Sequence, residues 1–213
     1  MQCLKNYMCS RSKERVSIDG NLDKEVWKAA SRVELVDAVT GEKPMQGTNV
    51  SLLWDNEFLY IAFDCEDREI RAACTGFNDP LYNEDVMEIY IDDNNDLKTY
   101  LEFEVNPRNA ILHYMITNNL EGIFLGYARL QNNVVSKVIR KEVEKRTWYE
   151  MAIPFVEFAT ADHIPPKSGD TWKLNLFRVD RGENGQDEYS AWSPTGKVAF
   201  HKPKYFGELR FVE

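Results

Sequence analysis

Apolar side chains recur at every second position along most of this chain. In residues 48–54, the apolar side chains of Val50, Leu52 and Trp54 follow this period. Two turn-forming residues come next, and a second apolar stretch, residues 58–64, follows them. A period of two places successive side chains on opposite faces of a β-strand. The pattern therefore predicts a β-hairpin here.

Residues 85–92 and 100–106 form the most regular pair of predicted strands. One face carries apolar side chains alone, namely Met87, Ile89 and Ile91 on the first strand and Leu101, Phe103 and Val105 on the second. The opposite face carries Glu88 and Tyr90, then Glu102 and Glu104. We expect the apolar face to lie in the core and the aromatic and acidic face to form an outer surface.

Turn-forming residues separate further candidate strands at residues 110–117, 134–139, 147–153, 171–179 and 206–212. A helical period occurs only in short pieces, and the clearest is a helix of about two turns through Trp27, with Asp23 as its cap. Many strands and few helices favour a mostly β fold, an antiparallel two-sheet β-sandwich of jelly-roll-like form with a short N-terminal helix. No linker or repeat divides the chain, so residues 1–213 are predicted to be one domain.

Composition narrows the range of partners. Hydrophobic residues make up 43% and charged residues 29%, values that argue against a disordered or membrane-embedded chain. The net charge of −9 opposes binding to nucleic acid or to an anionic membrane. No apolar run resembles an export signal, so the sequence as given predicts a cytoplasmic chain, and an extracellular or periplasmic one if a signal has been removed.

The chain contains few residues that suit metal or redox chemistry. Cys3, Cys9, Cys65 and Cys74 lack paired spacing and neighbouring histidines, which favours idle or buried thiols. Phosphate-binding loops and nucleophile-elbow motifs are absent from the sequence. No catalytic residue is therefore predicted.

Four sequence blocks in order resemble the family 9 carbohydrate-binding modules and their free-standing relatives. These blocks are IDGNLDKEVWKAA, VSLLWDNEFLYIAFDCED, EDVMEIYIDD and YLEFEVNP, and SAWSPTG and FGELRF follow them near the end of the chain. The resemblance implies a β-sandwich that binds a mono- or oligosaccharide without transforming it, beside an associated glycoside hydrolase. It also implies that two aromatic rings clamp the sugar while polar side chains bond to its hydroxyl groups.

The resemblance also implies a set of binding residues. The first clamping aromatic residue falls on Tyr82, the D-x-x-E element on Asp85 and Glu88, and the second clamping residue on Trp192. An arginine of the sugar-binding prototype falls on Glu104, which replaces a donor by a carboxylate acceptor. An asparagine of the family falls on Tyr189. These six residues form the predicted ligand site.

Three alternatives stay open at this point. Paired glutamates such as Glu88 with Glu102 or Glu104 would suit a glycoside-processing enzyme if they flanked a cleft. A haem-binding sandwich is another option, although His113 and Met115 are two apart on one strand and suit opposite axial positions poorly. No cofactor or metal is predicted, but the acidic turn at residues 92–96 leaves structural calcium, which the resemblance implies, as an option.

Overall fold

The computed structural model describes residues 5–213, apart from the side chain of Asn184. Cys3 lies outside the described residues. Within them the chain forms fourteen strands, one α-helix and four short 3-10 helices. The strands are β1 (Asn6–Arg11), β2 (Arg32–Glu34), β3 (Val36–Asp37), β4 (Thr48–Trp54), β5 (Phe58–Glu66), β6 (Val86–Asp92), β7 (Thr99–Val105), β8 (Ile111–Asn118), β9 (Phe124–Ala128), β10 (Val135–Lys141), β11 (Arg146–Pro154), β12 (Thr171–Asp180), β13 (Glu188–Ala191) and β14 (Gly207–Val212). The helices are α1 (Glu25–Ala29), η1 (Leu81–Asn83), η2 (Phe155–Glu157), η3 (Glu183–Gly185) and η4 (Pro203–Tyr205).

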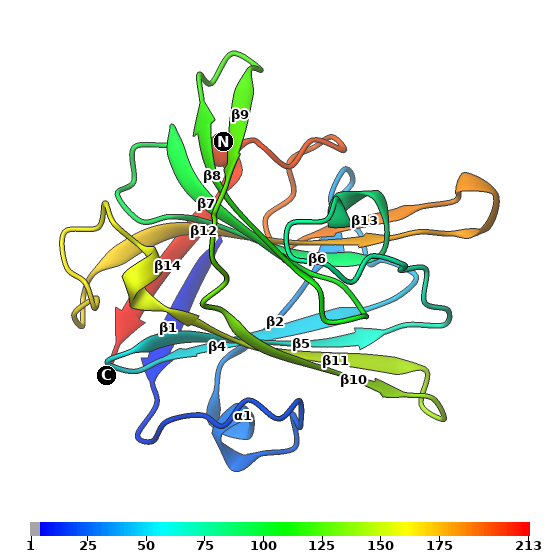
Figure 1. The fold of residues 1–213 in the computed structure, drawn as a ribbon, viewed down its shortest axis with the longest axis horizontal. Helices are drawn as coiled ribbons and strands as arrows, with labels where there is room; N and C mark the ends of the chain where they lie inside the picture. Colours follow the sequence, from blue (N-terminus) through cyan, green and yellow to red (C-terminus); the bar gives the residue numbers. More distant parts are fainter. Residues whose placement is uncertain (1–4) are drawn as a thin grey trace.

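All the strands belong to one hydrogen-bonded sheet that curls back on itself (Figure 1). Its main path runs β10-β11-β5-β4-β1-β14-β12-β6-β7-β8-β9. One half contains β4, β5, β10 and β11, and the other contains β6 to β9 and β12. The mostly β prediction is confirmed, but the two layers are halves of a single curled sheet.

The structure corrects the expectation of a purely antiparallel sheet. Strand β1 pairs in parallel with both β14 and β4 and so joins the two halves. Parallel neighbours need a long crossover, and the chain between β1 and β4 supplies one that includes α1. The alternation within each strand carries no information about this pairing direction.

The main apolar core fills the space between the two halves. It contains Ile61 and Phe63 of β5 together with Met87, Ile89 and Phe103 of β6 and β7. The predicted hairpins are confirmed, with Ile89 opposite Phe103 and Leu52 opposite Ile61. The apolar face of β6 and β7 therefore lies in the core as expected.

Helix α1 covers the outer face of β4, β5 and β11 (Figure 1). Its buried Trp27 packs against Tyr60, and the indole Nε1 donates to Glu150 Oε1 at 2.7 Å. The helix cap is Lys24, without a side-chain hydrogen bond, so the prediction of Asp23 as the cap is wrong. No helix among residues 5–213 combines the length and the apolar character needed to cross a membrane.

The outer face of β6 and β7 is buried, which corrects the expectation of an open acidic surface. Glu88, Tyr90, Glu102 and Glu104 are all buried. Phe206 and the partly buried Phe200, which lie near the end of the chain, pack on this face in a second apolar cluster. The covering segment leaves a pocket over this face of the sheet.

Candidate functional site

A pocket of about 530 Å³ opens over the outer face of β6, β7 and β8. Residues from η1, β9, β12, the η3 loop, β13 and the segment before η4 complete its walls. Seven aromatic or imidazole rings line it, namely Tyr82, Tyr90, Tyr114, Phe124, Tyr189, Phe200 and His201. Its charged lining side chains are Glu88, Glu102 and Arg181. Such a volume, with mostly apolar walls and a few polar groups, is typical of a small-ligand site.

Three carboxyl groups meet at and beneath the floor of this pocket. One carboxyl oxygen each of Glu88, Glu102 and Glu104 lies within 4.8 Å of the other two. Strand register explains the cluster, because Glu88 is opposite Glu104 and Tyr90 is opposite Glu102 on the same face. Glu88 and Glu102 line the pocket, while Glu104 is fully buried behind them.

The hydroxyl group of Tyr90 lies between two of these carboxyl groups. Its oxygen is 2.8 Å from Glu88 Oε2 and 2.7 Å from Glu102 Oε1. A hydroxyl has a single hydrogen to donate, so both contacts are hydrogen bonds only if one carboxyl group is protonated. The floor therefore offers donors as well as acceptors.

Burial and mutual repulsion explain why such protonation is favourable. Burial raises the pKa of Glu88, and the charge of Glu102 raises it further. Burial likewise raises the pKa of Glu102. For Glu104, burial is again the main cause of a pKa well above its usual range, followed by the charges of Glu88 and Glu102. The three groups cannot all ionise together without a nearby positive charge.

Aromatic rings fixed by stacking form the wall near η4. The ring of Phe200 stacks on Phe177 at 4.1 Å between centroids, and that of Phe124 stacks on His201 at 3.7 Å. His201 Nδ1 also lies 2.9 Å from the hydroxyl oxygen of Tyr100. These contacts hold the covering segment against β7 and β9, so this wall is built before any ligand binds.

Arg181 connects the two aromatic residues at the opposite rim. Its Nη2 donates to the backbone carbonyl of Tyr82 at 2.7 Å, and its Nη1 donates to the Tyr189 hydroxyl at 3.0 Å. The Asp187 carboxylate accepts from the same Nη1 at 2.6 Å and neutralises much of the guanidinium charge. Arg181 therefore positions the rim more than it balances the acidic floor.

The structure brings three of the six predicted site residues into the pocket lining. Tyr82 on η1 is 48% exposed and stands at the rim, Glu88 lies on the floor, and Tyr189 lies on the wall. Glu104 belongs to the carboxyl cluster but does not reach the pocket surface. Asp85 and Trp192 lie elsewhere.

Trp192 is a core residue, which corrects its predicted place in an exposed clamp. Its side chain is 2% exposed, and its ring meets Tyr7 edge-on at 6.4 Å between centroids. The backbone N–H of Trp192 donates to Leu176 of β12, which continues the sheet pairing of β13. The ring therefore points into the core between the sheet halves and cannot face Tyr82.

Asp85 holds two loops together outside the pocket, which corrects its predicted contact with a ligand. One of its carboxylate oxygens accepts from the backbone N–H of Arg71, and the other accepts from that of Arg181 at 2.7 Å. Burial raises the pKa of Asp85 to about 6. The residue supports the rim through Arg181.

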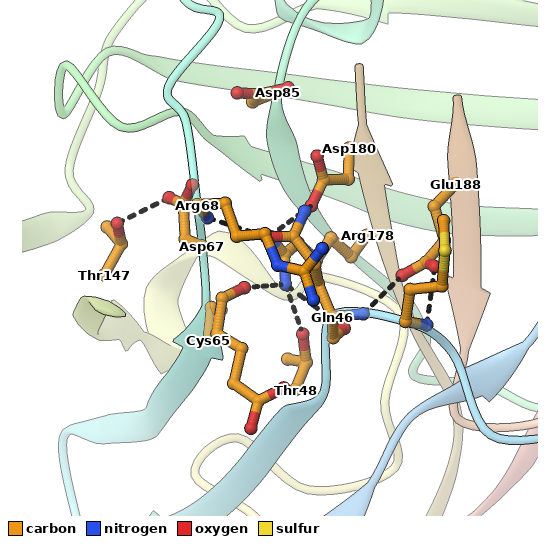
Figure 2. A network of polar contacts seen from close by, with 12 residues as sticks. Gln46, Thr48, Cys65, Asp67, Arg68, Asp85, Thr147, Arg178, Asp180 and Glu188 are labelled. Carbon is orange, nitrogen blue, oxygen red and sulfur yellow. Dashed lines mark hydrogen bonds and ion pairs between the residues drawn. The ribbon is translucent and has the colours of Figure 1, made fainter. Parts of the chain in front are cut away.

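Arg178 and Asp180 lie at the centre of a buried polar network (Figure 2). The guanidinium of Arg178 donates to Thr48 Oγ1 at 3.0 Å, to the Glu66 carbonyl at 2.7 Å, and to Asp180. Glu188 accepts from two backbone N–H groups in the loop that precedes β4. This network ties β12 and β13 to β4 and β5, so it fixes the strands behind the pocket.

Several lining residues were absent from the predicted site. Glu102 and Tyr90 share the alternating face of Glu88, a signal that the sequence does contain. Phe200 and His201 belong to a segment without periodicity, so only the folded chain places them over the sheet. Tyr114 lies on β8 and Phe124 on β9, and β9 is a strand that the sequence pattern did not predict.

The acidic turn of residues 92–96 uses its carboxylates to hold the backbone. Asp92 Oδ2 accepts from the Leu97 N–H at 2.9 Å, and Asp96 Oδ1 accepts from the Thr99 N–H at 2.7 Å. These bonds to the backbone explain why acidic residues are found in this turn. Calcium at this turn stays a prediction.

The geometry does not favour the two alternative functions. A glycosidase needs one carboxyl group on each side of the scissile bond, whereas Glu88 and Glu104 lie side by side on one sheet face. His113 is fully buried and stacks on Phe103 at 4.1 Å, while Met115 is substantially exposed. That pair cannot hold the two faces of a haem.

Comparison with known proteins agrees with this architecture. A 26% identical relative, described as an extracellular protein of Arthroderma benhamiae, aligns over 87% of each chain. Endo-1,4-beta-xylanase A of Thermotoga neapolitana is also 26% identical, over 92% of this chain but only 17% of the xylanase. The chain thus corresponds to most of the first relative and to a small part of the second.

Solved structures show the same fold. A carbohydrate binding module family 9 from Caldicellulosiruptor kristjanssonii, in complex with cellotriose, superposes with a TM-score of 0.72 at 16% identity, over 98% of this chain and 94% of that one. The profile of the carbohydrate family 9 binding domain-like family matches residues 18–213. Because this match spans most of the chain, the protein belongs to the carbohydrate family 9 binding domain-like family.

Proposed function

We propose that this protein binds carbohydrate without transforming it, and that the sugar occupies the pocket between Tyr82 and the floor of Glu88 and Glu102. The observation that supports this most strongly is the combination of an exposed ring at the rim with hydrogen-bonding groups at the base. The C–H face of a pyranose packs on an aromatic ring, and its hydroxyl groups need directional partners. Family membership points to the same ligand class.

Tyr82 and Tyr189 are the proposed stacking residues. Arg181 bonds to the backbone carbonyl of Tyr82 and to the hydroxyl of Tyr189 and so links the two residues, and this pair replaces the predicted pairing of Tyr82 with Trp192. Glu88 and Glu102 would exchange hydrogen bonds with sugar hydroxyl groups, with Tyr90 oriented between them. Neutral sugars suit this site, because an acidic sugar would meet the carboxyl cluster.

Calorimetric titration with mono-, cello- and xylo-oligosaccharides tests this proposal. Tyr82→Ala should weaken binding at least about tenfold, or about 1.4 kcal/mol. Tyr127→Ala is a matched control, because Tyr127 is 50% exposed on β9 and does not line the pocket. Its affinity should equal that of the native protein. Absence of binding across the panel, or equal losses in both variants, would contradict the proposal.

We further propose that the protein acts beside a glycoside hydrolase, which it would hold close to the polysaccharide. The support is that the related xylanase contains its similar segment within a much longer chain. Isolation of the native protein from its source, followed by assays for glycosidase activity in the same complex or chain, tests this idea. A preparation that binds sugar but carries no such activity would argue against it.

A further inference from the structure

We propose that Glu88, Glu102 and Glu104 form a binding site for calcium at the floor of the pocket. The site is distinct from the acidic turn of residues 92–96, and it does not depend on sugar binding. Three features support it: the spacing of the three carboxyl groups, the lack of hydrogen bonds to the carboxyl oxygens of buried Glu104, and the charges around the cluster.

The spacing suits a calcium ion. One oxygen from each carboxyl group lies within 4.8 Å of the others. Calcium binds oxygen ligands at 2.3–2.6 Å, so ligands on opposite sides of the ion are about 4.6–5.2 Å apart. Three carboxylates provide up to six oxygen ligands, and hard oxygen ligands without nitrogen or sulfur favour calcium over zinc or copper.

Glu104 provides an independent indication of a ligand. It is fully buried, and neither of its carboxyl oxygens has a hydrogen bond. The Glu102 carboxyl and the Tyr82 backbone are its polar neighbours, and a hydrogen bond between the two carboxyl groups would form only if one of them were protonated. Buried polar atoms without partners cost about 1–3 kcal/mol each, so such a group in a native fold calls for an explanation. A cation held between Glu104 and its two neighbours supplies one.

The surroundings leave the negative charge of the cluster largely unopposed. Arg181 is the charged basic residue of the pocket lining, and Asp187 already forms an ion pair with it. His201 lies 3.4 Å from the Tyr90 hydroxyl, but burial lowers its pKa to about 4 and keeps it neutral. Tyr90 contributes a neutral hydroxyl oxygen. Among the described residues, no positively charged side chain therefore occupies the place that calcium would take.

Terbium luminescence provides the test, because Tyr90 contacts the cluster and can sensitise a bound lanthanide. Protein stripped with EDTA is titrated with Tb³⁺ and then with Ca²⁺ as competitor, and calorimetry gives the calcium affinity directly. We expect saturable calcium binding with Kd below about 1 mM, the weak end for protein calcium sites. Glu104→Gln keeps the shape of the side chain and removes a ligand charge, so it should weaken binding by about tenfold or more.

The control is Asp96→Asn in the acidic turn, which should leave the affinity unchanged. Circular dichroism establishes that each variant is folded, and Glu102→Gln replaces Glu104→Gln if the latter does not fold. Two results would overturn the proposal. One is the absence of saturable calcium binding, and the other is loss of binding in Asp96→Asn together with native affinity in the glutamate variants. Sugar titrations run separately, so failure of the calcium site leaves the sugar proposal standing.

Discussion

Glu88 on β6 and Glu104 on β7 lie directly opposite each other in the antiparallel pair, so their carboxyl groups share one face of the sheet. Like charges in such cross-strand positions repel, and burial increases this repulsion. This unfavourable arrangement lies at the floor of the aromatic-lined pocket. A structural role alone would be better served by an apolar pair, which supports a ligand role for this face.

The carboxyl cluster predicts an unusual pH dependence of stability in metal-free buffer. Burial raises the pKa of Glu102 to about 7, and burial together with the charge of Glu102 raises that of Glu88 to about 8, both well above the usual 4.5 of a glutamate. The folded state then holds protons that the unfolded state has lost, so stability falls as pH rises through this range. Urea unfolding should show a loss of about 1–3 kcal/mol between pH 6.5 and 8.5.

The two buried histidines do not alter the pH dependence of stability between pH 6.5 and 8.5. Burial lowers the pKa of His113 to about 3 and that of His201 to about 4, so they make stability rise with pH only below about 6.5. Glu88→Gln should flatten the profile above pH 6.5. A native protein whose stability is constant or increases from pH 6.5 to 8.5 would show that these carboxyl groups are ionised in the folded state.

Truncation of Trp192 should destabilise the protein strongly, whereas truncation of Tyr82 should hardly change its stability. Trp192→Ala removes a ring from the core and should lower the free energy of unfolding by about 3–5 kcal/mol. Tyr82→Ala removes a half-exposed ring and should change it by no more than about 0.5 kcal/mol. Denaturant unfolding of the two variants gives both numbers. Equal destabilisation would show that Tyr82 is a packing residue and not a rim residue.

Gly207 is required because the Trp192 ring packs on its backbone. A Cβ atom at this position would lie 2.5 Å from Trp192 Cζ3 and 2.7 Å from the Lys5 carbonyl oxygen. Gly207→Ala should therefore cost about 1–3 kcal/mol of stability. Gly47→Ala is the control, because the nearest atom to its added Cβ is 3.5 Å away, an ordinary contact. Thermal unfolding that ranks the two variants equally would contradict this packing.

Arg178 should be essential to the network behind the pocket. Arg178→Met leaves the buried Asp180 carboxyl without its ion-pair partner, although Gln46 still donates to it, and we expect a loss of about 3–5 kcal/mol at pH 7.5. Arg210→Met serves as the comparison, because Arg210 pairs with Glu208 at the surface and such pairs contribute about 0–1 kcal/mol. Urea midpoints measure both. A small loss for Arg178→Met would mean that Asp180 is neutral in the native protein.

Local pattern was sufficient to predict nine of the fourteen strands that the structure describes and the core face of the main hairpin, but it did not reveal β1, β2, β3, β9 or β13. Ile89 and Phe103 lie in the core as the alternation indicates, because a strand fixes the face of each side chain by position alone. Trp27 and Trp54, which fall in periodic segments, are likewise buried. Family resemblance added Tyr82 and Glu88, both of which line the pocket.

The sequence by itself determined that this chain forms alternating strands with a continuous apolar face, since that pattern depends only on neighbouring residues. Tertiary structure alone decided that β1 pairs in parallel, that Trp192 points into the core, and that Phe200 and His201 cover the acidic face. These outcomes depend on contacts between segments far apart in the chain. Alternation assigns two faces to a strand, but only long-range packing determines what covers the second face.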